Sequence, residues 1–317
     1  MKLVRYFGSL LCIGTCLALS ACTSSTAEVV QTSVVQQDTL PTTPEFITGW
    51  AEVEKLKPKF LVFGELHGTR ESPLLVSKLA SNLAAQGKRV LVAVELEARY
   101  DADLQRAWNE TPTEFAIRLK TLGWAARKDG VASEAMFEML VTLHKEKHAG
   151  ALVSIAAFNS FKDDTQKQRL ETLGSQNGHE MAQAENIAYA ADANQYDHVL
   201  VLVGNLHAQK AEVVRPSFSF KPMVLHLQNS GKVVSLNMLY SGGTAWNCTL
   251  KEGMNRVAGS PITADMIDCS SKTARGLPST MNAPRLGLGS FGETTAAENY
   301  DGYYWLGTVS GSAPAVP

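Results

Sequence analysis

The chain has 317 residues, of which 45% are hydrophobic and 19% are charged, and its formal net charge is −2. Roughly 270 residues follow an N-terminal region of signal and linker character, which is enough to bury one sizeable α/β core. A charge balance this even excludes the basic surface that nucleic-acid binding requires, so we expect no nucleic-acid partner.

The N-terminus has the pattern of a secretion signal, which we place at residues 1–21. Lys2 and Arg5 form a basic start, and an apolar stretch follows from Phe7 to Leu19. This stretch is too short for a membrane-spanning helix, so we expect it to be removed on export.

Residues 19–22 (LSAC) resemble a bacterial lipobox, in which small residues precede a cysteine. The resemblance implies cleavage before Cys22 and lipid attachment to its thiol, which makes a membrane one partner of the protein. Thr23, rather than an aspartate, resembles the outer-membrane sorting pattern and implies an anchor in the bacterial outer membrane, facing the periplasm. An ordinary signal peptide cleaved nearby is the alternative. Residues 22–44, rich in Ser, Thr and Gln, predict a flexible tether.

Strand-like and helix-like segments alternate between Pro58 and Tyr240. We expect strands at residues 60–63, 89–96, 151–158, 198–203, 223–227 and 233–240. We expect helices at residues 71–86, around 104–108, from 112 onward, at 133–147 and at 178–193. The alternation predicts an α/β domain over residues 45–240, with a largely parallel sheet flanked by helices on both faces.

Two local patterns support these helices. Leu75, Leu79 and Leu83 lie four residues apart and would share one helical face. The spacing of a capping box, with proline at the first helical position, is found at residues 111–114 (TPTE).

Residues 241–317 differ in composition from the preceding domain, because many glycines, serines and threonines interrupt the hydrophobic periodicity. We predict a loop-rich extension packed on the domain, with an edge strand at residues 303–306 and a frayed tail at residues 311–317. Cys248 and Cys269 remain in the folded part after signal removal and lipidation. In an oxidising compartment such a pair predicts a disulfide.

A short pattern, G-x-x-H directly after an apolar run, occurs twice in this chain. The copies are Gly64–His67 (GELH) and Gly204–His207 (GNLH). Continuous apolar runs are typical of buried parallel strands, and open α/β sheets bind ligands at the carboxyl ends of their strands. One copy alone more often marks a turn with a structural histidine, whereas two copies predict that both histidines converge on one site.

Acidic residues accompany both motifs. Glu65 lies two residues before the first histidine, and the pair suits general acid–base catalysis or metal ligation. Glu95 closes the second apolar strand, where a carboxylate is costly to bury without a partner. It is either functional or paired with Arg70 or Arg99. The alternation of the strand leaves Glu97 as the other candidate for the cleft.

The remaining histidines have weaker signals. His144 and His148 lie four apart, which permits a metal pair on one helical face. Because the stretch around them is highly charged and ends at a glycine, we expect a solvated helix terminus there instead. His198 precedes its strand and His226 lies on the predicted strand 223–227, and we interpret both as structural.

These motifs resemble the Tiki/TraB superfamily, which includes ChaN-type haem-binding uptake lipoproteins and is similar to the erythromycin esterases. The resemblance rests on residues 64–71 (GELHGTRE), on the glutamate after the second strand and on residues 204–208 (GNLHA). Residues 180–187 resemble the helix that precedes the last core strand in that superfamily. The resemblance covers roughly residues 58–228 and implies an α/β sheet with its site at the strand ends.

Three functions stay open for this site. The first is a hydrolase of esters or amides, an esterase or metallopeptidase acting on a small-molecule or peptide ligand. The second is non-covalent haem binding in iron uptake, and the third is a non-catalytic binding module. For the hydrolase, the catalytic candidates are Glu65, His67, Glu95 and His207, of which Glu65, His67 and His207 are the candidate ligands of a divalent metal. The substrate-side candidates are Arg70, Glu71, Asn205 and Glu180.

Overall fold

The computed structural model describes residues 47–123, 127–215, 218–252, 263–279, 281, 283–292 and 298–316. The predicted signal peptide, the lipidation site Cys22 and the tether lie outside the described residues. In the described part of the chain, we find no helix with the length and apolarity needed to cross a membrane.

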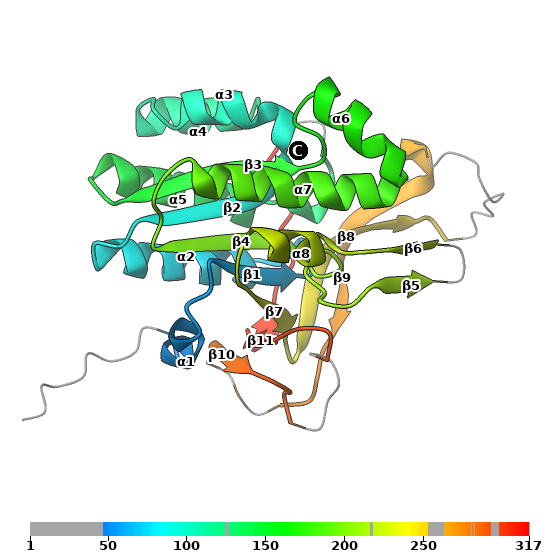
Figure 1. The fold of residues 1–317 in the computed structure, drawn as a ribbon. Helices are drawn as coiled ribbons and strands as arrows, with labels where there is room; N and C mark the ends of the chain where they lie inside the picture. The colour runs from blue at the N-terminus through cyan, green and yellow to red at the C-terminus, as the bar shows by residue number, and fades with distance from the viewer. Residues whose placement is uncertain are drawn as a thin grey trace, which may run out of the picture. The chain divides into compact units, whose positions relative to one another are not determined.

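Strands and helices alternate along most of this part of the chain (Figure 1). The strands are β1 (Phe60–Glu65), β2 (Val90–Glu97), β3 (Val153–Asn159), β4 (His198–Gly204), β5 (Val213–Arg215), β6 (Phe218–Phe220), β7 (Val233–Leu239), β8 (Gly242–Leu250), β9 (Ile267–Arg275), β10 (Arg285–Leu288), β11 (Gly302–Trp305) and β12 (Thr308–Val309). The helices are α1 (Trp50–Lys55), α2 (Glu71–Ala85), α3 (Asp101–Ala107), α4 (Pro112–Leu119), α5 (Glu134–His148), α6 (Asp164–Leu170), α7 (Ser175–Asp192) and α8 (Met223–Leu227).

The centre of the fold is a seven-stranded sheet in the order β10-β11-β7-β1-β4-β2-β3. Every neighbouring pair is parallel except β10 with β11. The continuous apolar run of β1 is buried along its whole length, as is the run of β4 after its first residue. This arrangement confirms the predicted α/β class with a largely parallel sheet.

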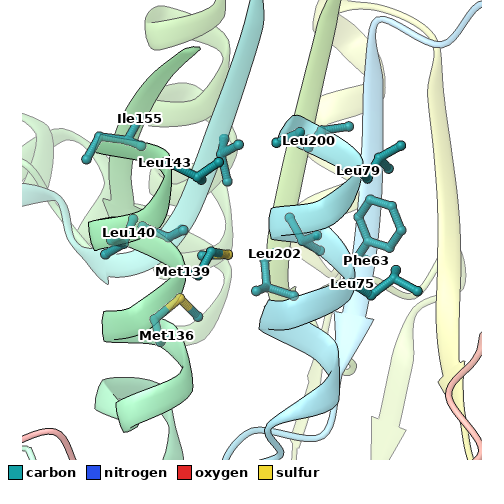
Figure 2. Close-up of a cluster of buried hydrophobic side chains, with 14 of the residues drawn as sticks. Phe63, Leu75, Leu79, Met136, Met139, Leu140, Leu143, Ile155, Leu200 and Leu202 are labelled. Atoms are coloured by element: carbon teal, nitrogen blue, oxygen red, sulfur yellow. The ribbon is translucent and has the colours of Figure 1, made fainter. Parts of the chain in front are cut away.

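Helices cover both faces of the sheet, and each face has its own apolar cluster. On one face α2 and α5 pack against β1, β2 and β4, as Figure 2 shows. There Leu75 and Leu79 contact the strands, and Leu83 is buried with them, as their spacing predicts. On the other face α7 and α8 pack against the same strands. The two helical layers leave the carboxyl edge of the sheet as the place where loops and side chains meet.

The prediction of a strand at residues 223–227 is wrong, because this segment is helix α8. A five-residue segment after a proline, with four apolar residues, fits either element by periodicity. Here Met223, Val224 and Leu227 are buried at helical spacing against α7 and the sheet. His226 therefore lies on a helix and not on a strand.

The C-terminal region contributes to the main sheet rather than only covering it. Residues 303–306 were expected at an edge, but β11 lies between β7 and β10, and β10 forms the edge. Tyr304 and Trp305 are fully buried as a result. Tyr304 packs edge-on against Phe63 of β1, and its hydroxyl group hydrogen-bonds the Ser72 hydroxyl over 2.9 Å.

The predicted frayed tail is also wrong for the described residues 311–316. Gly311 pairs with Thr69, Pro314 pairs with Ser133, and Ser312 is buried. Backbone groups of this segment are satisfied by loops of the domain, which is why the segment is ordered despite its small residues.

The predicted disulfide is confirmed. Cys248 and Cys269 are directly opposite each other on the antiparallel strands β8 and β9, and their sulfur atoms are bonded. The bridge thus closes a hairpin within the C-terminal region.

His144 differs from its predicted exposure. The side chain is fully buried, with its ring stacked on Phe115 at 4.2 Å and edge-on to Trp108. His148, one turn later, is exposed as expected. The prediction failed because it relied on the charged neighbours of His144, whereas His144 itself lies on the buried side of α5.

Candidate functional site

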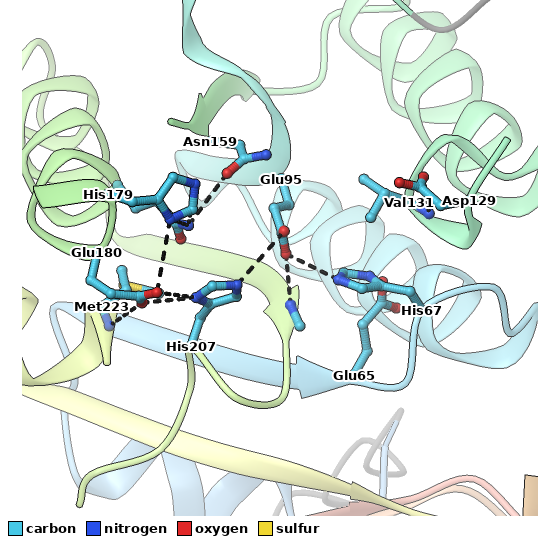
Figure 3. A network of polar contacts seen from close by, with 12 residues as sticks. Glu65, His67, Glu95, Asp129, Val131, Asn159, His179, Glu180, His207 and Met223 are labelled. Carbon is cyan, nitrogen blue, oxygen red and sulfur yellow. Dashed lines mark hydrogen bonds and ion pairs between the residues drawn. The ribbon is translucent and has the colours of Figure 1, made fainter. Parts of the chain in front are cut away.

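The candidate site lies at the carboxyl edge of the central strands. In the sheet, β1 and β2 flank β4, and Glu65 pairs with Gly204 in the register of β1 and β4. The two G-x-x-H motifs therefore leave neighbouring strands at the same level. Figure 3 shows the side chains that meet there.

His67 lies between two carboxylates. Its Nδ1 is 2.8 Å from Glu65 Oε1, and its Nε2 is 3.2 Å from Glu95 Oε2. Since both ring nitrogens face acceptors, the protonated imidazolium form satisfies both contacts. The approach depends on Gly204, because a Cβ atom there would stand 2.7 Å from His67 Nε2.

His207 has a carboxylate partner of its own. Its Nδ1 lies 2.8 and 2.9 Å from the two oxygens of Glu180 on α7. Glu180 is fully buried and also accepts hydrogen bonds from the backbone N–H of Met223 and the side chain of Gln176. These donors fix the carboxylate, which in turn fixes the orientation of the His207 ring.

Glu95 is the carboxylate that lies between the two histidines. Its Oε2 accepts a hydrogen bond of 2.8 Å from the Gly204 N–H, and its Oε1 is 4.0 Å from His207 Nε2. The pairing of β2 with β3 is irregular between Val94 and Glu97, so Glu95 and Glu97 are no longer equivalent positions of one regular strand. Glu97 forms an ion pair with Arg99 instead.

His67 and Glu95 strongly shift each other's pKa values. Burial by itself would lower the pKa of His67, but the charge of Glu95 and hydrogen bonds to Glu65 and Glu95 outweigh it and raise this pKa to about 10. Burial would raise the pKa of Glu95, but the charge and hydrogen bond of His67, the charge of His207 and the Gly204 N–H lower it to about 2. At neutral pH this pair is therefore an imidazolium and a carboxylate.

The pKa values of His207 and Glu180 are shifted in the same directions. Burial would lower the pKa of His207, but its hydrogen bond to Glu180 and the charges of Glu95 and Glu180 raise it. The pKa of Glu180 is lowered to about 2, because hydrogen bonds from His179 and His207 outweigh burial. Glu95 and Glu180 thus both increase the basicity of His207.

The other substrate-side candidates have partners outside this cluster. Arg70 forms an ion pair with Glu138, and Glu71 accepts two hydrogen bonds from Ser310. Asn205 is exposed, and its carbonyl oxygen accepts a hydrogen bond from the Tyr300 hydroxyl group. A role for these residues beside a substrate stays a prediction.

Gln183 and Asn159, two polar residues next to the site, were not predicted from the sequence. Gln183 on α7 is fully buried, and its Nε2 lies 3.1 Å from His179 Nδ1 and 3.3 Å from Asn159 Oδ1 at the end of β3. The ring of His179 is in turn 5.9 Å from that of His207. The four-residue spacing of His179 and Gln183 on one helix was the available signal, but it carried no link to either motif.

Metal ligation by Glu65, His67 and His207 was one prediction for this site. Among the residues that the structure describes, no group of three or more His, Cys, Asp or Glu side chains is arranged to hold a metal ion. Metal ligation therefore stays a prediction from the sequence.

Comparisons with known proteins agree on the fold. No protein-family model and no curated protein sequence matches this chain. Among solved structures, a mutant of the erythromycin esterase EreC in an open conformation matches with a TM-score of 0.56 and 11% identity, over 82% of this chain and 94% of its own. A succinoglycan biosynthesis protein matches with a TM-score of 0.51 and 11% identity, over 83% and 91% of the two chains.

A ChaN of Campylobacter jejuni, described with cofacial haem binding, is also similar. It is 18% identical over 59% of this chain and 84% of its own, with a TM-score of 0.35. The two more extensive matches show the class of fold, an α/β sheet protein whose fold is similar to those of these two structures. The resemblance inferred from the G-x-x-H motifs is thus confirmed for the fold.

Proposed function

We propose that this protein is a hydrolase that cleaves an ester or amide with an activated water molecule. The observation that carries the proposal is the convergence of two histidine–carboxylate pairs on Glu95. Each imidazole has its Nδ1 on a carboxylate of its own, and each turns its Nε2 toward Glu95. Paired titratable groups that lie together, with pKa values shifted by their neighbours, are typical of acid–base catalysis.

His207 is the proposed general base. The Nδ1–H donates to Glu180, so the neutral ring presents a lone pair on Nε2. The distance of 4.0 Å between His207 Nε2 and Glu95 Oε1 is too long for a direct hydrogen bond. It suits a water molecule within about 2.8 Å of both atoms. That water attacks the carbonyl carbon and gives its proton to His207 Nε2.

His67 is the proposed general acid. Glu65 and Glu95 keep its imidazolium form populated, with a pKa raised to about 10. When the tetrahedral intermediate breaks its bond to the alcohol or amine, the leaving group takes the proton of His67 Nε2. Glu95 stabilises the charged forms of both rings, and proton exchange with solvent resets His67 and His207 for the next cycle.

The test is turnover of a panel of chromogenic esters and amides by the chain that begins after Cys22. We expect His67→Ala, His207→Ala and Glu95→Gln each to lower kcat/KM by about 100-fold or more, because general acid–base groups contribute at this level. Glu97→Gln and His148→Ala are the matched controls, since one changes a carboxylate paired with Arg99 and the other an exposed histidine.

Four other outcomes would count against this mechanism. Turnover that is unchanged in the three variants would overturn it. Turnover that is lost on treatment with a chelator and restored by a divalent metal would support metal ligation instead. A saturable Soret band on titration with haemin, without turnover of any substrate, would favour haem binding, and the absence of every signal would favour a binding module.

We also propose that the protein is a lipoprotein anchored through Cys22 in a bacterial outer membrane, with the domain in the periplasm. The sequence of the signal and lipobox supports this location, and a disulfide between Cys248 and Cys269 is consistent with an oxidising compartment. Incorporation of a labelled fatty acid into the wild-type chain, and its loss in Cys22→Ser, would test the anchor. Label retained in the variant would contradict it.

A further inference from the structure

The loop that follows His67 is held by the end of the chain. Residues 310–316, which we name the C-terminal strap, are red in Figure 1. Arg70 N–H donates to the Ser310 carbonyl over 2.9 Å, and Ser312 N–H donates to the Gly68 carbonyl over 2.8 Å. Glu71 adds hydrogen bonds of 2.9 Å from Ser310 N and 2.6 Å from Ser310 Oγ. The strap thus pairs with the residues directly after His67.

The opposite side of the strap binds the start of α5. Ala135 N–H donates to Ser312 Oγ over 2.9 Å, and Glu134 N–H donates to the Ala313 carbonyl over 2.8 Å. Ala315 N–H donates to the Ala132 carbonyl over 3.0 Å. A single short segment therefore joins the His67 loop to α5, two parts of the domain that lie far apart in the sequence.

Gly68 is the point where these restraints meet. Its φ of +75° is a left-handed conformation that suits glycine, and its carbonyl accepts from Trp246 N–H as well as from Ser312 N–H. Two donors on one carbonyl fix the orientation of the peptide group between Gly68 and Thr69. Small displacements of a catalytic group cost much of its effect, so support of this kind matters to the ring of His67.

We propose that the C-terminal strap is a positioning element for His67, which keeps its ring nitrogens on Glu65 and Glu95. The part of this proposal that is tested by turnover rests on the proposed function. The part that is tested by the pKa of His67 does not. The strap acts on His67 through Gly68, Arg70 and Glu71.

The experiment removes residues 310–317 from the soluble chain and measures the pKa of His67 by NMR of its ring nitrogens. We expect this pKa to fall by about one unit or more, because a looser loop weakens both ion pairs. The pKa of His207, whose partner Glu180 has no contact with the strap, changes less. In turnover, kcat falls by about tenfold or more while KM changes little. A synthetic peptide of residues 308–317 restores both quantities.

Two point variants cover the case in which the shortened chain does not fold. Glu71→Gln weakens the attachment of Ser310, and Ser312→Ala removes the acceptor of the Ala135 N–H. The matched control is Glu134→Gln, which changes an exposed side chain beside the strap. We expect smaller falls in the His67 pKa for the first two variants and none for the control.

An unchanged His67 pKa in the folded shortened chain, or in both point variants if that chain does not fold, would overturn the proposal. Because the NMR readout needs no substrate, a protein without esterase or amidase activity would still decide the role of the strap.

Discussion

At the residue scale, the choice between Glu95 and Glu97 shows what a strand pattern can and cannot predict. In a regular strand these two residues share a face, so alternation leaves them equivalent. The irregular pairing of β2 between Val94 and Glu97 separates them, and it depends on the neighbouring strand β3. The sequence could thus predict that a carboxylate closes this strand, but not which of the two contacts the histidines.

The pH dependence of turnover follows from the two histidines. The base His207 must be neutral and its pKa is raised above 6.5, whereas the acid His67 must keep a proton and its pKa is about 10. We therefore expect kcat/KM to rise with pH above 6.5 and to fall again as pH approaches about 10. Glu180→Gln should move the rising limb to lower pH, because it removes a charge that raises the His207 pKa. A pH–rate profile measures both limbs, and an unmoved rising limb would argue against His207 as the base.

Acid should weaken the contribution of Glu95 to stability. Its pKa is lowered from 4.5 to about 2 in the folded chain, so the carboxylate stabilises the fold above pH 4.5 and this effect is lost as pH falls through 2. The difference in unfolding free energy between wild type and Glu95→Gln should shrink along this range. Urea unfolding at several pH values checks it, with Glu97→Gln as the comparison. A difference independent of pH would contradict the ion pair.

At the scale of elements, short-range patterns were predicted well where the physical cause is local. The capping box at residues 111–114 is present, with Thr111 and Glu114 exchanging hydrogen bonds at the start of α4. Helix α8 was missed because its conformation depends on packing against α7 and the sheet, which a segment of five residues does not encode. The partnership of Glu180 with His207 likewise depends on where α7 packs.

The cap of α4 gives a test that is independent of the site. Thr111→Ala removes the side-chain acceptor of the Glu114 N–H, so it should lower the unfolding free energy by about 1 kcal/mol. Denaturant unfolding measures the change. Thr113→Ala, two residues later and inside the helix, removes no capping hydrogen bond and should change stability much less. Equal effects of the two substitutions would show that the cap contributes little.

At the scale of the whole molecule, the C-terminal region was the least predictable part. Its glycines and serines gave no periodicity, yet β10 and β11 extend the main sheet beyond β7. The conformation of such segments depends on pairing with distant strands, and the local sequence does not reveal that pairing. The convergence of His67 and His207 was predictable for the opposite reason, because parallel strands bring their carboxyl ends together whatever the intervening sequence.

A chain that ends at Tyr240 tests this view. It would leave β7 as an exposed edge and remove the fully buried side chains of Tyr304 and Trp305. We expect the shortened chain to lose its cooperative thermal transition, because several large buried side chains are missing from the core. Circular dichroism during heating is the measurement. A cooperative transition would support a separable domain over residues 45–240.

The pairing of residues 310–316 with the loop after His67 also has a consequence for the timing of synthesis. A ribosome makes the chain from its N-terminus, so the G-x-x-H motifs exist long before their last structural neighbours. The His67 loop can reach its final conformation only after residues 310–316 have been made and have left the ribosome. The site therefore assembles late in synthesis, well after the residues of both motifs have been made.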